Sequence, residues 1–280
     1  MVVAVASGKG GTGKTTVAVN LARVFGERVQ LLDSDVEEPN AHLFFPAAQM
    51  QERYVVSQPV PYVDEKLCNA CGECALFCRF NAIVSFSTTP LVFPELCHSC
   101  GGCAVICPQK AITEMENRIG EVEILVADNI RLIKGVLDVG KPMAPPLIRA
   151  TLKYLEKNTP AIIDAPPGTS CPVIAALRGV DFALLVAEPT AFGLNDLALA
   201  VEVLYAIDVE FAVVINRDGS GDDRVKRFCD DRGIEVIASI PYDRRIAEIY
   251  AHGRLIVDAI PAYLEIFVNI KKRIQEKGAR

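Results

Sequence analysis

Residues 2–16 read VVAVASGKGGTGKTT: an apolar run, a glycine-rich turn and the start of a helical pattern. Residues 8–15 match G-x-x-x-x-G-K-[ST] between strand and helix, the context in which this pattern binds phosphate. Glycines let successive backbone N–H groups face phosphate oxygens, and the following helix adds its positive N-terminal end. We therefore expect a nucleotide-binding α/β fold. Loop contacts to nucleotide are expected from Gly8, Lys9, Gly10, Gly11, Thr12, Gly13, Lys14, Thr15 and Thr16.

Outward from this loop, short apolar runs alternate with helical patterns, which indicates a doubly wound, mostly parallel sheet flanked by helices. Predicted strands are Val2–Ser7, Val29–Asp33, Ala161–Asp164, Phe182–Ala187, Phe211–Asn216 and Glu235–Ile240. Predicted helices are Lys14–Phe25, Pro146–Glu156, Pro172–Arg178, Asn195–Ala206, Arg224–Asp231 and Pro261–Gln275. Residues 121–137 are expected to form a hairpin with Asp128–Asn129 at its turn.

Eight of the ten cysteines interrupt this rhythm in two similar runs. The runs are Cys68-x2-Cys71-x2-Cys74-x3-Cys78 and Cys97-x2-Cys100-x2-Cys103-x3-Cys107, the second followed by Pro108. At an offset of 29 residues, the two 16-residue windows are identical at eight positions. This spacing is typical of ferredoxins with two [4Fe–4S] clusters. Isolated zinc sites are the alternative, although tetrahedral zinc suits arrays of this length poorly.

The resemblance to two-cluster ferredoxins implies a crossed ligand set, because there the fourth cysteine of each run serves the other cluster. Cluster 1 would use Cys68, Cys71, Cys74 and Cys107, and cluster 2 would use Cys97, Cys100, Cys103 and Cys78. In the first run Arg79 replaces the usual proline, and its charge either tunes a potential or has no effect. His98 is interpreted as a bystander rather than a ligand.

The simplest parse is a P-loop ATPase domain in two parts, 1–58 and 119–280, interrupted at 59–118 by an inserted α+β ferredoxin domain. Removing roughly 60 residues leaves roughly 220, an ordinary size for one domain.

Lys9 is an addition to the ordinary phosphate-binding pattern. With it, KGGTGKT resembles the deviant-Walker ATPases, the family of MinD, ParA, Mrp-type cluster carriers and the nitrogenase iron protein. The resemblance implies that Lys9 acts on phosphate in trans, across a nucleotide-sandwich dimer. The alternative is a solvated lysine. The loop pattern itself assigns Lys14 to the β- and γ-phosphates and Thr15 to Mg²⁺.

Two further segments, each ending an apolar strand, resemble the switches of this family. In Asp33-Ser34-Asp35, similar to switch I, Asp35 would orient the attacking water, and Asn40 matches a polar switch position. The segment from Asp164 to Gly168 is similar to Walker B and switch II. Asp164 would hold Mg²⁺ through water, and the Gly168 N–H would sense the γ-phosphate. An aspartate ending a strand can also be a simple turn residue.

The resemblance also places Asn216, Pro241 and Asp243 in the loops that frame adenine. We expect ATP and ADP rather than guanine nucleotides, because no NKxD-type motif follows Asn216.

The charge and hydropathy of the chain bear on which partners and which cellular compartment we expect. A net charge of −6 argues against a general nucleic-acid binder. No apolar run approaches the roughly 18 residues of a membrane span. No export signal precedes the loop, so we expect a reducing cytoplasm, where CxxC arrays bind metals or clusters. The amphipathic C-terminal stretch 263–280 is expected to dock through Leu264, Phe267 and Ile274 rather than to bind membrane as MinD does.

These features together predict an Mg-dependent ATPase that dimerises, with itself or with a similar ATPase, and couples hydrolysis to electron transfer through two [4Fe–4S] clusters to an unidentified partner. The alternatives are a cluster carrier and a MinD-like spatial-organisation ATPase with structural or sensory clusters. Neither bridging-cluster design of the family is reproduced, because Cys171 and Cys229 each stand alone. Cys171 is instead expected to be a small residue at a helix start.

Overall fold

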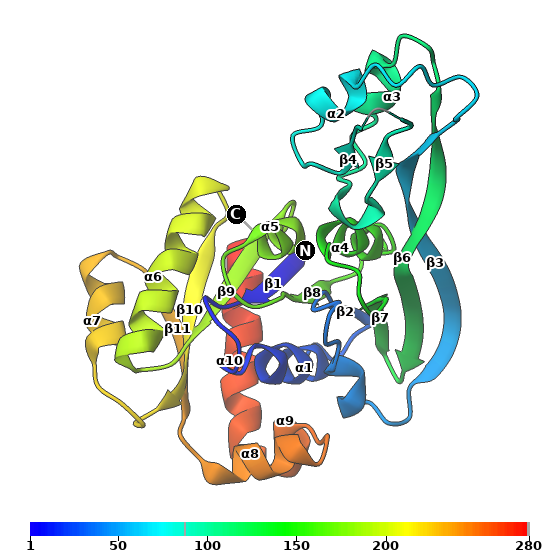
Figure 1. Ribbon diagram of the computed structural model, residues 1–280. Coiled ribbons are helices and arrows are strands. Elements are labelled where there is room, and N and C mark those ends of the chain that lie inside the picture. The colour runs from blue at the N-terminus through cyan, green and yellow to red at the C-terminus, as the bar shows by residue number, and fades with distance from the viewer. Residues whose placement is uncertain (87, 279–280) are drawn as a thin grey trace.

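The computed structural model describes residues 1–86 and 88–278. Within them, nine strands form one sheet in the order β11-β10-β9-β1-β8-β2-β7-β6-β3 (Figure 1). From β11 to β7 all neighbours are parallel, whereas β6 and β3 are antiparallel additions at one edge. The expected α/β fold with a large, mostly parallel sheet is therefore confirmed. The parallel strands are β1 Val2–Ala6, β2 Val29–Asp33, β7 Ile130–Leu137, β8 Ala161–Asp164, β9 Phe182–Ala187, β10 Phe211–Asp218 and β11 Val236–Pro241.

Alternate residues of each strand face opposite layers of helices. In β1, Val3 and Val5 lie in a core with α1 and α10, whereas Ala4 and Ala6 lie in a core with α4, α5, α6 and α7. The helices are α1 Lys14–Val24, α4 Pro145–Leu152, α5 Cys171–Leu177, α6 Ala191–Ala206, α7 Arg224–Asp231, α8 Arg244–Ala251, α9 Ile256–Ala259 and α10 Pro261–Gly278. Sequence reasoning missed the short helices α8 and α9. Cys171 begins α5, as expected.

The C-terminal helix docks on the sheet with one correction to the expected residues. Phe267 and Ile274 are fully buried, but Leu264 is 43% exposed and Tyr263 is buried instead. Tyr263, Phe267, Ile270 and Ile274 recur at helical spacing and make one stripe, and Leu264 lies about 100° around the helix from Tyr263. No helix in the described ranges is long and apolar enough to cross a membrane.

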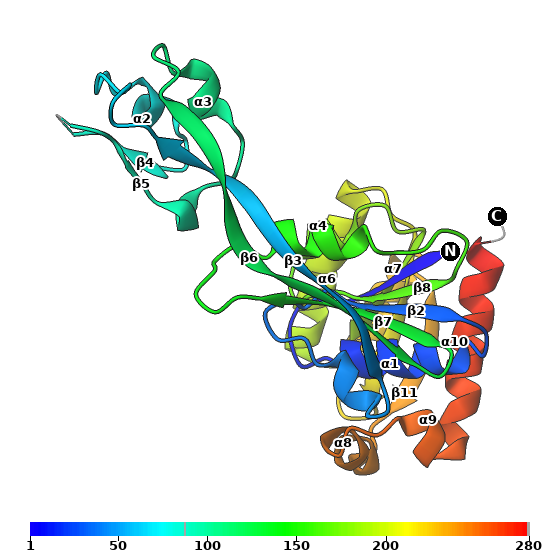
Figure 2. The same cartoon turned by 90° about the vertical axis from the view of Figure 1, so that its right-hand side faces the viewer.

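A two-stranded ribbon leaves the edge of the sheet. Strands β3 (Gln49–Val63) and β6 (Ile112–Ala127) pair along their whole length, but β6 pairs with β7 only over 120–127. Figures 1 and 2 show the remainder projecting away from the helices. Prolines 59 and 61 are tolerated because β3 is an edge strand. The expected domain boundaries, 58/59 and 118/119, fall inside these two strands.

The ribbon carries residues 64–111, which we call the cysteine module, at its far end (Figure 2). The module contains α2 Glu73–Phe77, β4 Ile83–Val84, β5 Leu91–Val92, η2 Pro94–Leu96 and α3 Gly102–Ile106. At the other end of β3 lies the 3₁₀ helix η1, Ala41–Phe44. The expected hairpin closes at Asp128, whose φ is 50°, between β6 and β7.

Candidate nucleotide site and paired cysteine sites

The glycine-rich loop connects the carboxyl end of β1 to the first turn of α1 and is closely packed. A Cβ on Gly8 would lie 2.0 Å from the Asp196 carbonyl oxygen, and one on Gly13 would lie 2.3 Å from Asn216 Nδ2. Gly13 also has φ of 94°, which favours glycine. The Asn216 side-chain amide donates to the Thr12 carbonyl oxygen at 2.7 Å. Asn216, in β10, is thus placed against the phosphate-binding loop.

Four of the expected acidic and basic groups gather where β2 and β8 end. Asp33 and Asp164 are register partners on adjacent strands, and both are buried. Burial raises the pKa of Asp33 well above its usual range, and the nearby Asp164 carboxylate raises it further. Burial lowers the pKa of Lys14, although Asp164 and Asp35 oppose that shift. The carboxyl edge of the sheet therefore concentrates ionisable groups in a dry region.

Asp164 has the properties of a metal-associated carboxylate. Neither of its buried oxygens accepts a hydrogen bond from any described residue, and burial raises its pKa to about 7. Thr15 lies close enough to lower that pKa, though not in hydrogen-bonding geometry. An unpaired buried carboxylate is costly, and a hard cation such as Mg²⁺ with oxygen ligands would satisfy it. The residues present therefore fit Mg²⁺ between Thr15 and Asp164.

The switch-like segment is tied to the chain that leads into the ribbon. Asp33 accepts hydrogen bonds from the backbone N–H of Ala41 at 2.9 Å and of Asp35 at 3.2 Å. Asn40 precedes η1 as its N-terminal flanking residue. Burial raises the pKa of Asp35, which is more accessible than Asp33. The carboxylate of Asp33 therefore fixes the path between β2 and η1.

Lys9 contacts its own chain. Its ammonium lies 3.3 Å from Glu188 and 3.8 Å from Asp196. Arg217 also pairs with Glu188 and donates to the Gly11 carbonyl oxygen at 3.3 Å. Sequence reasoning missed Glu188, Asp196 and Arg217. Glu188 could have been found by the same signal as Asp164, since it directly follows an apolar strand, β9.

The remaining expected contacts are more dispersed. The Gly168 N–H donates to the Ser7 carbonyl oxygen at 3.1 Å, and Gly168 has φ of 96°. Pro241 ends β11. Asp243 caps α8 by accepting from the Arg245 N–H at 2.9 Å. The Arg245 guanidinium also lowers the pKa of Asp243 to about 2, so this carboxylate is engaged by its own helix.

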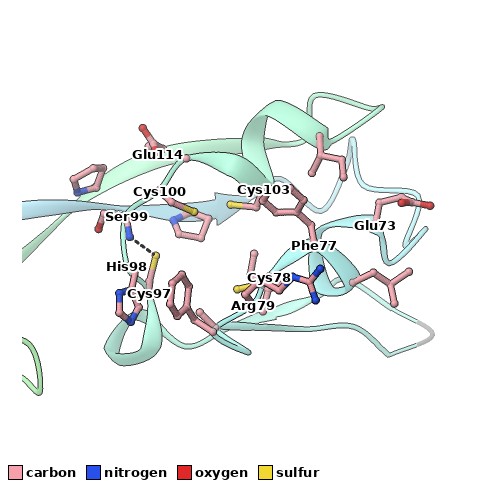
Figure 3. A pocket seen from close by; sticks show the side chains of 18 residues that line it. Glu73, Phe77, Cys78, Arg79, Cys97, His98, Ser99, Cys100, Cys103 and Glu114 are labelled. Carbon is pink, nitrogen blue, oxygen red and sulfur yellow. Dashed lines mark hydrogen bonds between the residues drawn. The ribbon is translucent and has the colours of Figure 1, made fainter.

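In the cysteine module, two cavities divide the eight expected cysteines into crossed sets. Site 1 is lined by Cys68, Cys71, Cys74 and Cys107, and site 2 by Cys97, Cys100, Cys103 and Cys78. Each set takes three cysteines from one run and the fourth from the other. All eight are free thiols. Figure 3 shows the cysteines of site 2 around their cavity.

The two halves repeat in backbone as well as in sequence. Left-handed conformations recur at the 29-residue offset, in Ala70 and Ser99, in Gly72 and Gly101, and in Asn81 and Lys110. The Ala70 N–H donates to Cys68 Sγ at 3.4 Å, and the Ser99 N–H donates to Cys97 Sγ at the same distance. Amide donors of this kind stabilise thiolates in clusters. The two halves are therefore related by pseudo-two-fold symmetry, and each has a loop whose backbone N–H donates to a cysteine sulfur.

The donor chemistry of both sites fits an iron–sulfur core. Burial raises the pKa of Cys103 to about 11 and also raises that of Cys74, so a bound cation is needed to hold these groups as thiolates. The cavity beside site 2 has a volume of about 580 Å³, and the one beside site 1 about 20 Å³. Among the described residues, no three His, Cys, Asp or Glu side chains converge closely enough for a single metal ion.

Comparison with known proteins agrees with the fold. The family model for the CobQ/CobB/MinD/ParA nucleotide binding domain matches residues 3–256. An uncharacterized protein of Methanocaldococcus jannaschii is 31% identical over 99% of this chain and 97% of its own length. The iron-sulfur cluster carrier protein of Pyrococcus furiosus is 22% identical over 98% of this chain and 86% of its own.

Among solved structures, the septum site-determining protein MinD of Pyrococcus horikoshii, complexed with Mg-ADP, superposes with a TM-score of 0.62. It is 20% identical, and the match covers 98% of this chain and 95% of that one. MinD in a MinC:MinD complex of Aquifex aeolicus gives a TM-score of 0.57 at 18% identity, covering 98% and 96% of the two chains. Such distant likenesses show a shared fold. On the family match, the chain belongs to the CobQ/CobB/MinD/ParA nucleotide-binding family of P-loop ATPases.

Proposed function

We propose that this protein is an ATP-driven dimerising switch that controls electron transfer through two [4Fe–4S] clusters to a partner protein. The observation that carries the proposal is the division of eight cysteines into two crossed sets of four, on a ribbon rooted beside the nucleotide site. Joining a ferredoxin-like module to an ATPase would let the bound nucleotide control where or when the clusters exchange electrons.

In the nucleotide half, each proposed role follows from position. Lys14 would bind the β- and γ-phosphates, and the Gly168 N–H would exchange its Ser7 partner for the γ-phosphate. Mg²⁺, when bound, supplies charge stabilisation to the phosphates. Asp35, at the edge of the acidic cluster, would orient the attacking water. Asn216, Pro241 and Asp243 would frame adenine, with Asn216 in addition fixing the loop backbone.

Lys9 would complete the site of a second chain in a dimer, partnered by this chain or a similar ATPase. To do so it must leave Glu188 and Asp196, which hold it in cis. Glu188 is buried, but it also pairs with Arg217, so its carboxylate would keep a cationic partner after Lys9 leaves. Lys9 could therefore exchange this contact for a phosphate without leaving Glu188 unpaired, and formation of the dimer and release of Lys9 would be linked.

The ribbon offers a route from nucleotide to clusters. Switch I is joined to β3 through η1, since Asp33 holds the Ala41 N–H. Beside it, Lys134 is the register partner of Asp33 and pairs with Glu123 at 2.9 Å. Glu123 in turn pairs with Arg53 of β3 at 2.6 Å. A change in the position of Asp33 would therefore be transmitted to both strands of the ribbon, β3 and β6, at the end nearer the sheet.

A second function, delivery of clusters to apo-proteins, is favoured by the names of three relatives. Proteins of Pyrococcus furiosus, Pyrococcus abyssi and Aquifex aeolicus, 22%, 23% and 25% identical to this chain, are called iron-sulfur cluster carrier proteins. Electron transfer is the better fit to a site in which four cysteines enclose each group. Transfer to an acceptor is easier when fewer ligands hold the cargo.

The test is anaerobic reconstitution of the full chain with iron and sulfide. We expect about eight irons per chain in two [4Fe–4S] groups, with reversible one-electron reduction and retention of iron in the presence of an apo-ferredoxin. Rapid transfer of iron to the apo-ferredoxin would support the carrier function instead. Binding of one or two zinc ions in place of the iron would contradict both.

A further inference from the structure

The end of strand β10 is irregular where it meets the phosphate-binding loop. Its pairing with β11 shifts between Ile215 and Asp218, where β10 has one residue more than its neighbour. Within this bulge Arg217 has φ of 56°, a left-handed conformation that is uncommon for a residue other than glycine. Bulges occur frequently beside functional sites, where they redirect side chains. The direction of the Arg217 side chain is therefore informative.

The bulge brings two consecutive side chains to one loop. In a regular strand, neighbouring side chains point to opposite faces of the sheet. Here the Asn216 side-chain amide donates to the Thr12 carbonyl oxygen at 2.7 Å. The Arg217 guanidinium donates to the carbonyl oxygen of the preceding loop residue, Gly11, at 3.3 Å. The left-handed backbone at Arg217 thus lets both side chains hold consecutive carbonyl groups of the phosphate-binding loop.

Holding these carbonyl groups fixes the direction of the N–H groups that follow them. The peptide bonds of the loop are trans, and in a trans peptide the C=O and the next N–H point in opposite directions. Because the Gly11 carbonyl is turned toward Arg217, the Thr12 N–H points away from it. The Gly13 N–H points away from Asn216 for the same reason. Loops of this pattern bind phosphate through such N–H groups.

The Arg217 guanidinium is itself held in place. It pairs with Glu188, a buried carboxylate directly after β9, while its other arm contacts Gly11. The planar fork of a guanidinium can serve a carboxylate and a carbonyl oxygen at once, whereas a lysine ammonium holds its partners in a less fixed geometry. The left-handed backbone and the ion pair with Glu188 therefore both direct Arg217 to the loop.

We propose that Arg217 is a positioning residue of the nucleotide site. It holds the Gly11 carbonyl on its own side of the loop, so that the Thr12 N–H faces the phosphates on the other side before nucleotide binds. A loop prepared in this way needs no reordering on binding, so the contact raises the affinity for the phosphates of ATP and ADP. The inference rests on the nucleotide-binding part of the proposed function, and the clusters do not enter it.

The test is isothermal titration of the full chain with Mg·ADP, together with thermal unfolding of the nucleotide-free protein. Arg217→Gly removes the guanidinium and suits the left-handed backbone. Its affinity for ADP should fall about tenfold, as expected for the loss of one charge-assisted hydrogen bond. Its unfolding temperature should change little, because Lys9 still pairs with Glu188. Arg217→Lys should lose less affinity, since it keeps a charge for Glu188 without the fork.

Steady-state hydrolysis separates positioning from catalysis. The loop contact is the same in the bound substrate and in the transition state, so in Arg217→Gly the KM for ATP should rise by a similar factor with kcat little changed. Arg232→Gly is the control, because Arg232 is exposed to a similar extent and pairs with Glu202 and not with the loop. This control should bind ADP as the wild type does.

The two ideas fail differently. A wild type that does not bind Mg·ADP would overturn the proposed function and this inference with it. A wild type that binds, with Arg217→Gly and Arg217→Lys as tight as the wild type or no weaker than Arg232→Gly, would overturn the inference alone. A fall in kcat with KM unchanged would do the same, because Arg217 would then act in hydrolysis rather than position the loop.

Discussion

The nucleotide site and the cysteine module differ in how much apolar core supports them. The first lies at the carboxyl edge of a sheet whose two faces are covered by large apolar cores. Among its described residues, the second shares two small buried clusters with the end of the ribbon, one of Val63, Cys74, Ile83 and Ile112 and one of Val60, Ala82 and Cys97. We therefore expect the ATPase half to fold without its ligand and the module to depend on what its cysteines bind.

Removing iron should therefore have the largest effect, and only on the module. A strong chelator is expected to unfold residues 64–111, because so few apolar side chains are buried there, and to leave the sheet intact. Hydrogen exchange resolved by segment measures this. Unfolding of β1 or β8 on chelation would contradict the independence of the two halves.

Lys14→Ala should have the next largest effect, and it should affect the nucleotide site and not the cysteine module. Loss of a charge-assisted contact to phosphate costs about 2 to 3 kcal/mol, so ATP affinity should fall roughly 30- to 150-fold. Iron content after reconstitution should not change. Isothermal titration with a non-hydrolysable ATP analogue provides the affinity. An equal loss of iron would show that the two regions are not separate in folding.

The buried aspartates should give the nucleotide-free protein an unusual pH dependence. The folded-state pKa of Asp164 is raised to about 7 from 3.8, so between these values the unfolded chain binds fewer protons than the folded one. The contribution of Asp164 to the free energy of unfolding is therefore largest at low pH and falls, by on the order of 1 kcal/mol per pH unit, as pH rises toward 7. Asp33 should act in the same direction.

Asp164→Asn should reduce this slope, and Mg·ATP should stabilise the wild type most near pH 7. Denaturant unfolding at pH 5 and pH 7 measures both effects. An identical slope in wild type and Asp164→Asn would contradict the proposed source of the pH dependence.

Glu188→Gln should have the smallest effect. It weakens the contact that holds Lys9 in cis, so the ATP-dependent dimer should increase, but only a few-fold, because Asp196 still pairs with Lys9. Sedimentation with a non-hydrolysable ATP analogue reports the dimer. Glu202→Gln is a matched control, because Glu202 of α6 pairs with Arg232 at the end of α7 and not with Lys9. Equal behaviour of the two variants would argue against release of Lys9.

Much of both regions could be predicted from sequence, for local reasons. Strand, loop and helix follow one another directly around Lys14. The spacing of the cysteines, in turn, predicts which of them share a site in the module. Strand β3 was not predicted, since its prolines and its exposed, charged residues make sense only at the edge of a sheet. Glu188 follows an apolar strand as Asp164 does, but its contact with Lys9 depends on which segments meet in the fold, and no pattern in the chain gives that.

On the proposed function, nucleotide bound beside the base of the ribbon controls electron transfer at its far end. The most direct measurement is the rate at which reduced methyl viologen reduces the loaded protein, with Mg·ATP and without nucleotide. We predict a rate that changes with Mg·ATP in the wild type and is insensitive to it in Lys14→Ala. A rate that is the same in all four conditions would contradict the account.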